Sequence, residues 1–151
     1  MTTSYSAASA YSRVGMETGV SNADPHKLIL MLFEGAILAV GNAIGHLERN
    51  EIGPKGASIS HAISIIDSGL NASLDLTSGG EIARNLSSLY QYMSNRLLLS
   101  NLNNDMAGLE EVRKLLIELK GAWEEIGRKQ DSAPLEPSGP ANRASISYGQ
   151  I

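Results

Sequence analysis

The stretch GGEIARNLSSLYQYMSNRLLLSNLNND, residues 79–105, carries the most regular hydrophobic pattern in the chain. At about 100° per residue, one face of a helix collects most of its apolar side chains. That face comprises Ile82, Ala83, Leu86, Leu89, Tyr90, Met93 and Leu97. The spacing therefore predicts a helix from about residue 80 to Ser100 that packs this face against a core or its rim.

The same helix carries apolar side chains outside that face. Tyr92 and Leu99 are seven residues apart and fall together on a different side, with Leu98 further round. A surplus of apolar surface on one helix indicates contact with a second partner.

A second helix is expected upstream, beginning at a clear start signal. Asp24 is a good N-cap, and Pro25 has the fixed φ and missing N–H that suit a first helical position. The run LILMLFEGAILAV, residues 28–40, then follows, and Gly53 and Pro54 are expected to act as breakers after this helix.

Two further helices complete the expected fold. Over residues 56–76 one stripe suits a core, and a shallower stripe about 100° away contains Ile65, Gly69, Ala72 and Leu76. Another helix is expected from a cap at Asn104 or Asp105 to Gly127. Four helices with short connections predict an all-α, antiparallel up-down four-helix bundle.

The two ends of the chain differ from this middle part in composition. Residues 1–24 are rich in Ser, Thr, Ala and Gly, which predicts a flexible N-terminal arm. Residues 130–151 contain three prolines in a polar run, which predicts a disordered tail. The bundle domain is accordingly assigned to residues 25–129.

Composition excludes several classes of function. The formal charge is −4 without any basic run, which argues against nucleic acid or an anionic membrane as partner. No stretch of 18 consecutive apolar residues and no secretory signal is visible, so we expect no membrane insertion and a cytoplasmic location. The chain has no cysteine, which removes disulfides and thiolate metal sites.

The residues that carry chemistry form no recognisable active site. His26, His46 and His61 lie at no metal-ligand spacing, and neither a nucleophile elbow nor a phosphate-binding glycine loop is present. We therefore expect no enzyme activity, no metal and no cofactor. Phosphotransfer through His46 stays open as an alternative, although the basic neighbour and the glycine one turn later are missing.

Several motifs, in the same order and spacing, resemble the flagellar export chaperone FliS family. They are DPHKLILMLFEGA at 24–36, IIDSGL at 65–70, GGEIARNLSSLYQYM at 79–93 and AYSRV at 10–14. The resemblance implies a cytoplasmic chaperone that binds the C-terminal segment of flagellin and prevents its premature polymerisation. It also implies delivery of flagellin to the export gate protein of the flagellar type III apparatus, and an important role for Tyr11 in client binding.

The surplus stripes of the two middle helices supply candidate flagellin contacts. These are Ile65, Ala72, Leu76, Tyr92 and Leu99, joined in the arm by Tyr11 and by Val14, three residues further on. Homodimerisation through the same surface remains an alternative, as does a self-associating bundle with another helical client.

Overall fold

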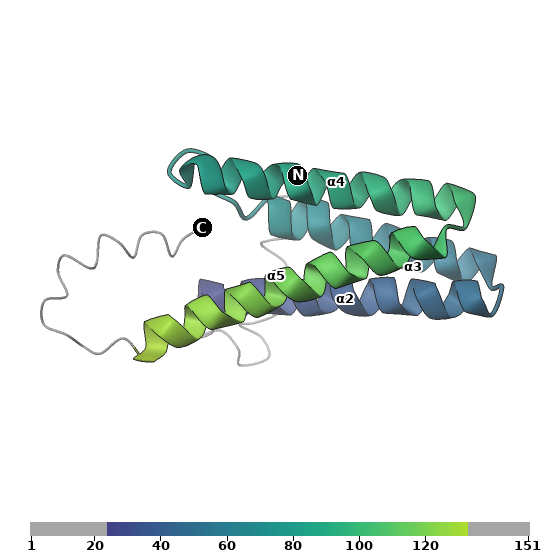
Figure 1. Cartoon of the computed structure of the whole chain (residues 1–151), viewed down its shortest axis with the longest axis horizontal. Coiled ribbons are helices and arrows are strands. Elements are labelled where there is room, and N and C mark those ends of the chain that lie inside the picture. The colour runs from purple at the N-terminus through teal and green to yellow at the C-terminus, as the bar shows by residue number, and fades with distance from the viewer. Residues whose placement is uncertain (1–23, 133–151) are drawn as a thin grey trace, which may run out of the picture.

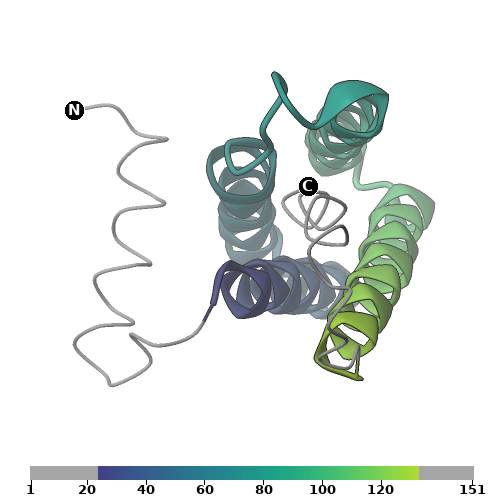
Figure 2. The same ribbon diagram turned by 90° about the vertical axis from the view of Figure 1, so that its left-hand side faces the viewer.

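The computed structural model describes residues 24–132, with side chains through Lys129, and every regular element in that range is helical. The elements are α2 (Pro25–Glu48), α3 (Ile52–Ser64), the π-helical segment η2 (Ile65–Asn71), α4 (Gly80–Asn103) and α5 (Met106–Ser132). Consecutive helices run in opposite directions (Figure 1) and occupy the four corners of a bundle (Figure 2). The expected up-down four-helix bundle is confirmed.

Helix α2 is the central packing element, because both α3 and α5 lie against it. It begins as expected: Asp24 accepts a hydrogen bond from the Lys27 backbone N–H at 2.9 Å, and Pro25 takes the first helical position. Its length and hydropathy would also allow it to cross a membrane, but the core helix of a soluble bundle meets the same criterion. Its buried residues are Leu32, Phe33, Ala36, Ala39, Val40, Ala43 and Ile44.

Helix α3 begins four residues earlier than its pattern predicted. Gly53 and Pro54 do not separate the two helices but lie in the first turn of α3. Proline is tolerated there because a backbone N–H in the first turn has no intrahelical acceptor. The reversal comes before them, at Asn50, whose φ of 61° is left-handed. The early start places Lys55 inside the helix, where it is only 2% exposed.

The π-helical turn of η2 changes which side chains face the core. A wider turn advances by a smaller angle per residue, so the two stripes predicted for a regular helix merge. Ile65, the first residue of η2, packs against Gly35 of α2 and is buried at 5% exposure, so its expected place on an exposed stripe is wrong. Gly69 allows this close approach, because a Cβ there would lie 2.9 Å from Leu32 Cδ2 on α2.

Helices α4 and α5 meet closely at their shared turn. Asn104 takes a left-handed conformation with φ 51°, and Asp105 caps α5 by accepting from the Gly108 N–H at 3.2 Å. Gly108 faces the hydroxyl of Ser100, which a side chain at position 108 would overlap. The Ser100 hydroxyl is buried and has no hydrogen-bond partner among the described residues.

Helix α5 continues past its predicted end. Gly127 was expected to close it, but the helix runs on to Ser132, so the domain boundary set at residue 129 falls inside a helix. The glycine instead makes room for the imidazole ring of His26, which a Cβ at position 127 would overlap. The predicted arm up to residue 23 and the tail from residue 133 lie outside the described residues.

Candidate functional site

An apolar pocket of about 200 Å³ opens at the end of the bundle where α2 begins and α5 ends. We call it the end pocket. Its lining residues are Ile29, Phe33, Leu70, Ser73, Leu74, Ile82, Leu86, Tyr90, Leu119, Ala122, Trp123 and Ile126. They come from α2, from η2 and the connection after it, from the first half of α4 and from the second half of α5.

The pocket exists because α4 and α5 diverge. The two helices are in contact near their shared turn and separate towards the other end of the bundle (Figures 1 and 2). There, Ile82 on α4 cannot bury itself against α5 and remains 58% exposed, although it lies on the core-facing pattern. An apolar side chain left open beside a concave apolar wall is typical of a binding site.

The chemistry of the pocket is almost wholly uncharged. No Asp, Glu, Lys or Arg lines it. Tyr90 is buried, and desolvation raises the pKa of its phenol well above the ordinary value, so the ring stays neutral. The pocket therefore favours an apolar side chain over a charged one.

One edge of the pocket is held by a reciprocal contact between α2 and α5. His26 Nε2 donates to the Trp123 carbonyl oxygen at 2.6 Å, and Trp123 Nε1 donates to the His26 carbonyl oxygen at 2.9 Å. The two rings stack with centroids 4.8 Å apart. We call this pair the His26–Trp123 clasp; it fixes the Trp123 ring as a pocket wall.

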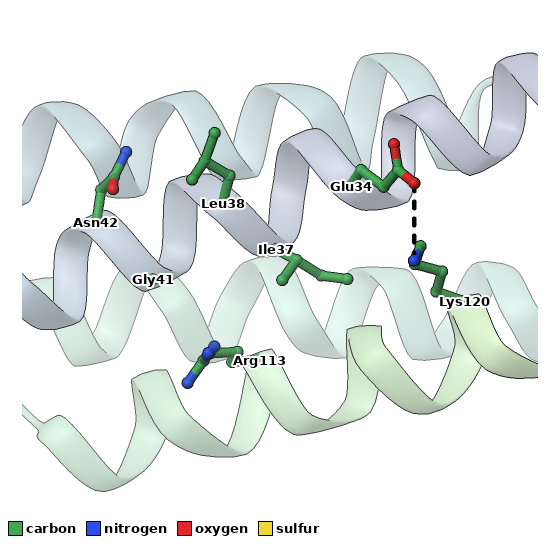
Figure 3. Close-up of a pocket in the computed structure, with 7 residues that line it drawn as sticks. All are labelled: Glu34, Ile37, Leu38, Gly41, Asn42, Arg113 and Lys120. Carbon is green, nitrogen blue, oxygen red and sulfur yellow. Dashed lines mark ion pairs between the residues drawn. The ribbon is translucent and has the colours of Figure 1, made fainter.

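A second hollow of about 280 Å³ lies between α2 and α5 on the side of the bundle. Figure 3 shows Ile37 of α2 pointing towards Arg113 and Lys120 of α5, whereas Leu38 points away from α5. An ion pair of 3.7 Å joins Lys120 to Glu34. Its lining mixes apolar and charged groups. An unbroken apolar surface is found in the end pocket, which is the stronger candidate for a docked apolar segment.

The predicted contact residues do not form one surface. Ala72 and Leu76 are exposed in the connection before α4, whereas Tyr92 and Leu99 are exposed on α4 itself. The Tyr92 hydroxyl points towards α5, where it donates to Glu111 Oε2 at 2.6 Å. Ile65 is in the core, and Tyr11 and Val14 lie outside the described residues.

Sequence reasoning did not find the end pocket, because its walls look like ordinary core positions. Ile82 and Tyr90, for example, belong to the face that was assigned to the core or its rim. The periodicity of one helix cannot show that two neighbouring helices diverge. The sequence feature that could have indicated the pocket is an excess of core-type residues at one end of the helices over the other end.

Charged side chains join α4 to α5 at the opposite end from the pocket. Arg96 donates to Glu111 Oε1 at 2.7 Å and to Asp105 Oδ2 at 3.1 Å. Hydrogen bonds from Tyr92 and then Arg96 lower the pKa of the Glu111 carboxyl below its ordinary value. The Gly108 N–H, followed by Arg96, lowers the pKa of Asp105.

We expect Glu111→Gln to weaken the pH dependence of folding. Because the folded carboxyl has the lower pKa, the unfolded chain binds more protons as the pH falls below about 4.5, and the stabilisation present at neutral pH is lost. Thermal unfolding at about pH 7 and pH 3 should therefore show a smaller loss of Tm in the variant than in the wild type. Glu110→Gln, on the exposed neighbour, is the control, and equal losses in all three proteins would contradict the assignment.

Comparison with known proteins places this bundle in a family. The family model described as flagellar protein FliS matches residues 7–130. The chain belongs to the FliS family. The flagellar secretion chaperone FliS of Salmonella typhimurium is 50% identical over 120 residues, which cover 80% of this chain and 89% of the relative. The flagellar secretion chaperone FliSB of Pseudomonas aeruginosa is 45% identical over 77% of this chain and 91% of the relative. FliS of Bacillus subtilis is 28% identical over 72% of this chain and 80% of the relative.

Membership of the FliS family supports a role as an export chaperone. The resemblance seen in the motifs is confirmed. No group of three His, Asp or Glu side chains within residues 24–129 is arranged to hold a metal ion. The family match ends at residue 130, so the last 21 residues of the chain lie beyond it.

Proposed function

We propose that this FliS family member is a cytoplasmic export chaperone for flagellin. It binds the C-terminal segment of flagellin, keeps the subunit from polymerising prematurely and assists its delivery to the export gate protein of the flagellar type III apparatus. The observation that carries the proposal is the open, uncharged end pocket in a chain of this family. Binding and delivery require no active site.

The end pocket suits a client that folds as it binds. An amphipathic segment can insert an apolar side chain between the diverging α4 and α5, where Ile82 is already exposed. Such a client offsets its loss of chain entropy chiefly by burying apolar surface. Leu99 and Tyr92, on the far half of α4, offer a further contact along the same helix.

Removal of the C-terminal segment of flagellin should abolish co-purification with this protein. Intact flagellin and a flagellin that lacks its last few tens of residues are compared under the same conditions. We expect recovery of the intact protein alone. Equal recovery of both flagellins would contradict the proposal and favour a self-associating bundle with another client. In that case the protein without flagellin should elute from a size-exclusion column at the volume of a dimer.

Calorimetry on the same complex distinguishes apolar from charge-driven association. Burial of the end pocket should give a large negative heat-capacity change and a weak dependence on salt. A strongly salt-dependent complex with little heat-capacity change would instead point to the charged hollow around Arg113 and Lys120.

The arm residues Tyr11 and Val14 remain proposed client contacts. If the arm shares the client surface, deletion of residues 1–20 should weaken flagellin binding. If it acts as a lid over the site, the same deletion should strengthen binding. An unchanged affinity would remove the arm from the binding site.

A further inference from the structure

The end pocket is accessible from the chain's own C-terminal side. Helix α5 forms one wall through Leu119, Ala122, Trp123 and Ile126, and it continues to Ser132. At 1.5 Å per residue, the end of the helix lies only about 9 Å beyond Ile126 along its axis. The residues that follow are therefore tethered beside the pocket.

The sequence after α5 contains a segment whose chemistry matches the pocket. Residues 144–151, ASISYGQI, carry no charged side chain and include Ile146, Tyr148 and Ile151. Ile146 lies 14 residues after Ser132, a length that can span at most about 50 Å when extended. This reach far exceeds the distance back to the pocket.

We infer that residues 144–151 occupy the end pocket of their own chain when no partner fills it, with Ile146 and Tyr148 as the inserted side chains. The tether supplies an effective concentration in the millimolar range, so a weak intrinsic affinity suffices. The family model matches residues 7–130, so residues 144–151 lie outside it and their docking is inferred for this chain alone. The inference concerns the chain alone and does not depend on which client binds.

The position of the N-terminal arm favours the tail over the arm as the occupant. The arm leaves the bundle at Asp24, which lines a separate hollow together with His26, Lys27 and Glu124. That hollow shares no lining residue with the end pocket, and the His26–Trp123 clasp lies between them.

Trp123 reports directly on occupancy, because it is the single tryptophan of the chain and lines the pocket. The full-length protein is compared with the double variant Ile146→Ser, Tyr148→Ser and with Leu135→Ser, a matched change nearer to α5. We expect the double variant to shift Trp123 emission to longer wavelength and to increase its quenching by acrylamide. The Leu135→Ser control should match the wild type.

Trypsin supplies a second measurement, since Arg143 lies three residues before Ile146. A tail docked ten times more often than free should be cleaved at Arg143 about tenfold more slowly than an undocked tail. The double variant should therefore lose this protection, with cleavage at Arg13 in the arm as the internal reference.

Three results would overturn the inference. The first is emission and cleavage in the double variant equal to those of the wild type. The second is a change in Trp123 emission on Tyr11→Ser but not on the tail substitutions, which would make the arm the occupant. The third is protection of Arg143 that disappears on dilution, which would assign the pocket to the tail of a second copy.

Discussion

Lys55→Ala is expected to lower the free energy of unfolding by about 3 kcal/mol, and with it the Tm by roughly 10 °C. The Lys55 ammonium is buried and donates to the Asn101 carbonyl oxygen at 2.9 Å and to Asn104 Oδ1 at 2.5 Å. These acceptors lie at the C-terminal end of α4, where the helix dipole is negative and the last carbonyl groups have no intrahelical partner. Removal of the ammonium loses both hydrogen bonds and leaves the Asn101 carbonyl oxygen, on a half-buried residue, without this partner.

Two controls separate the charge from the packing of its stem. Lys55→Met keeps most of the aliphatic length, so a loss of stability in this variant measures the ammonium alone. Lys114→Ala, on the exposed face of α5, should change Tm little. Thermal and denaturant unfolding of all three variants are compared with the wild type, and a Lys55→Ala protein as stable as the Lys114→Ala control would refute the capping role.

Lys55 also shows where sequence reasoning fails. Lysine is almost never fully buried unless it is paired, so a sequence pattern places it in solvent. Its partners lie 46 and 49 residues further along the chain, and no local rule identifies them. The local signals that succeeded, Asp24 and Pro25, act within one helical turn of themselves.

Both η2 and the last part of α5 contain a glycine that lies against a side chain of another helix. Gly69 lies in η2, and Leu32 of another helix packs so closely against its backbone that a Cβ there would lie 2.9 Å from Leu32 Cδ2. Gly127 looks like a helix terminator in sequence, yet it faces the His26 ring across the bundle. Gly127 was expected to end its helix, whereas Gly69 was placed on the shallower stripe; both glycines provide space for a side chain of another helix.

The bundle was predictable because each helix carries a face with a regular 3.6-residue period. The candidate site was not, because it depends on the angle between α4 and α5. Tyr92 and Leu99 were correctly placed on an exposed side of their helix, whereas Ile82 was assigned to a core that does not close around it. A direct comparison of variants on the two surfaces tests which one binds flagellin.

Ile82→Asp is expected to weaken flagellin binding about a hundredfold. On the proposed function, a client side chain covers Ile82 in the end pocket, and a carboxylate there would have to lose water without gaining a partner, because no cation lines the pocket. A penalty of about 3 kcal/mol corresponds to that change in Kd. Since the bundle itself leaves Ile82 58% exposed, the substitution should leave helicity and Tm nearly unchanged.

Leu99→Asp is the matched variant, because it introduces the same charge on the same helix at a residue of similar exposure, 44%, outside the pocket. Both variants and the wild type are titrated with flagellin, and their circular dichroism and Tm are recorded. If the end pocket is the principal site, Ile82→Asp should lose far more affinity than Leu99→Asp. The reverse order would move the site to the Tyr92 and Leu99 side of α4, and full binding by Ile82→Asp would exclude the end pocket, since a buried unpaired carboxylate cannot be neutral to a complex that covers it.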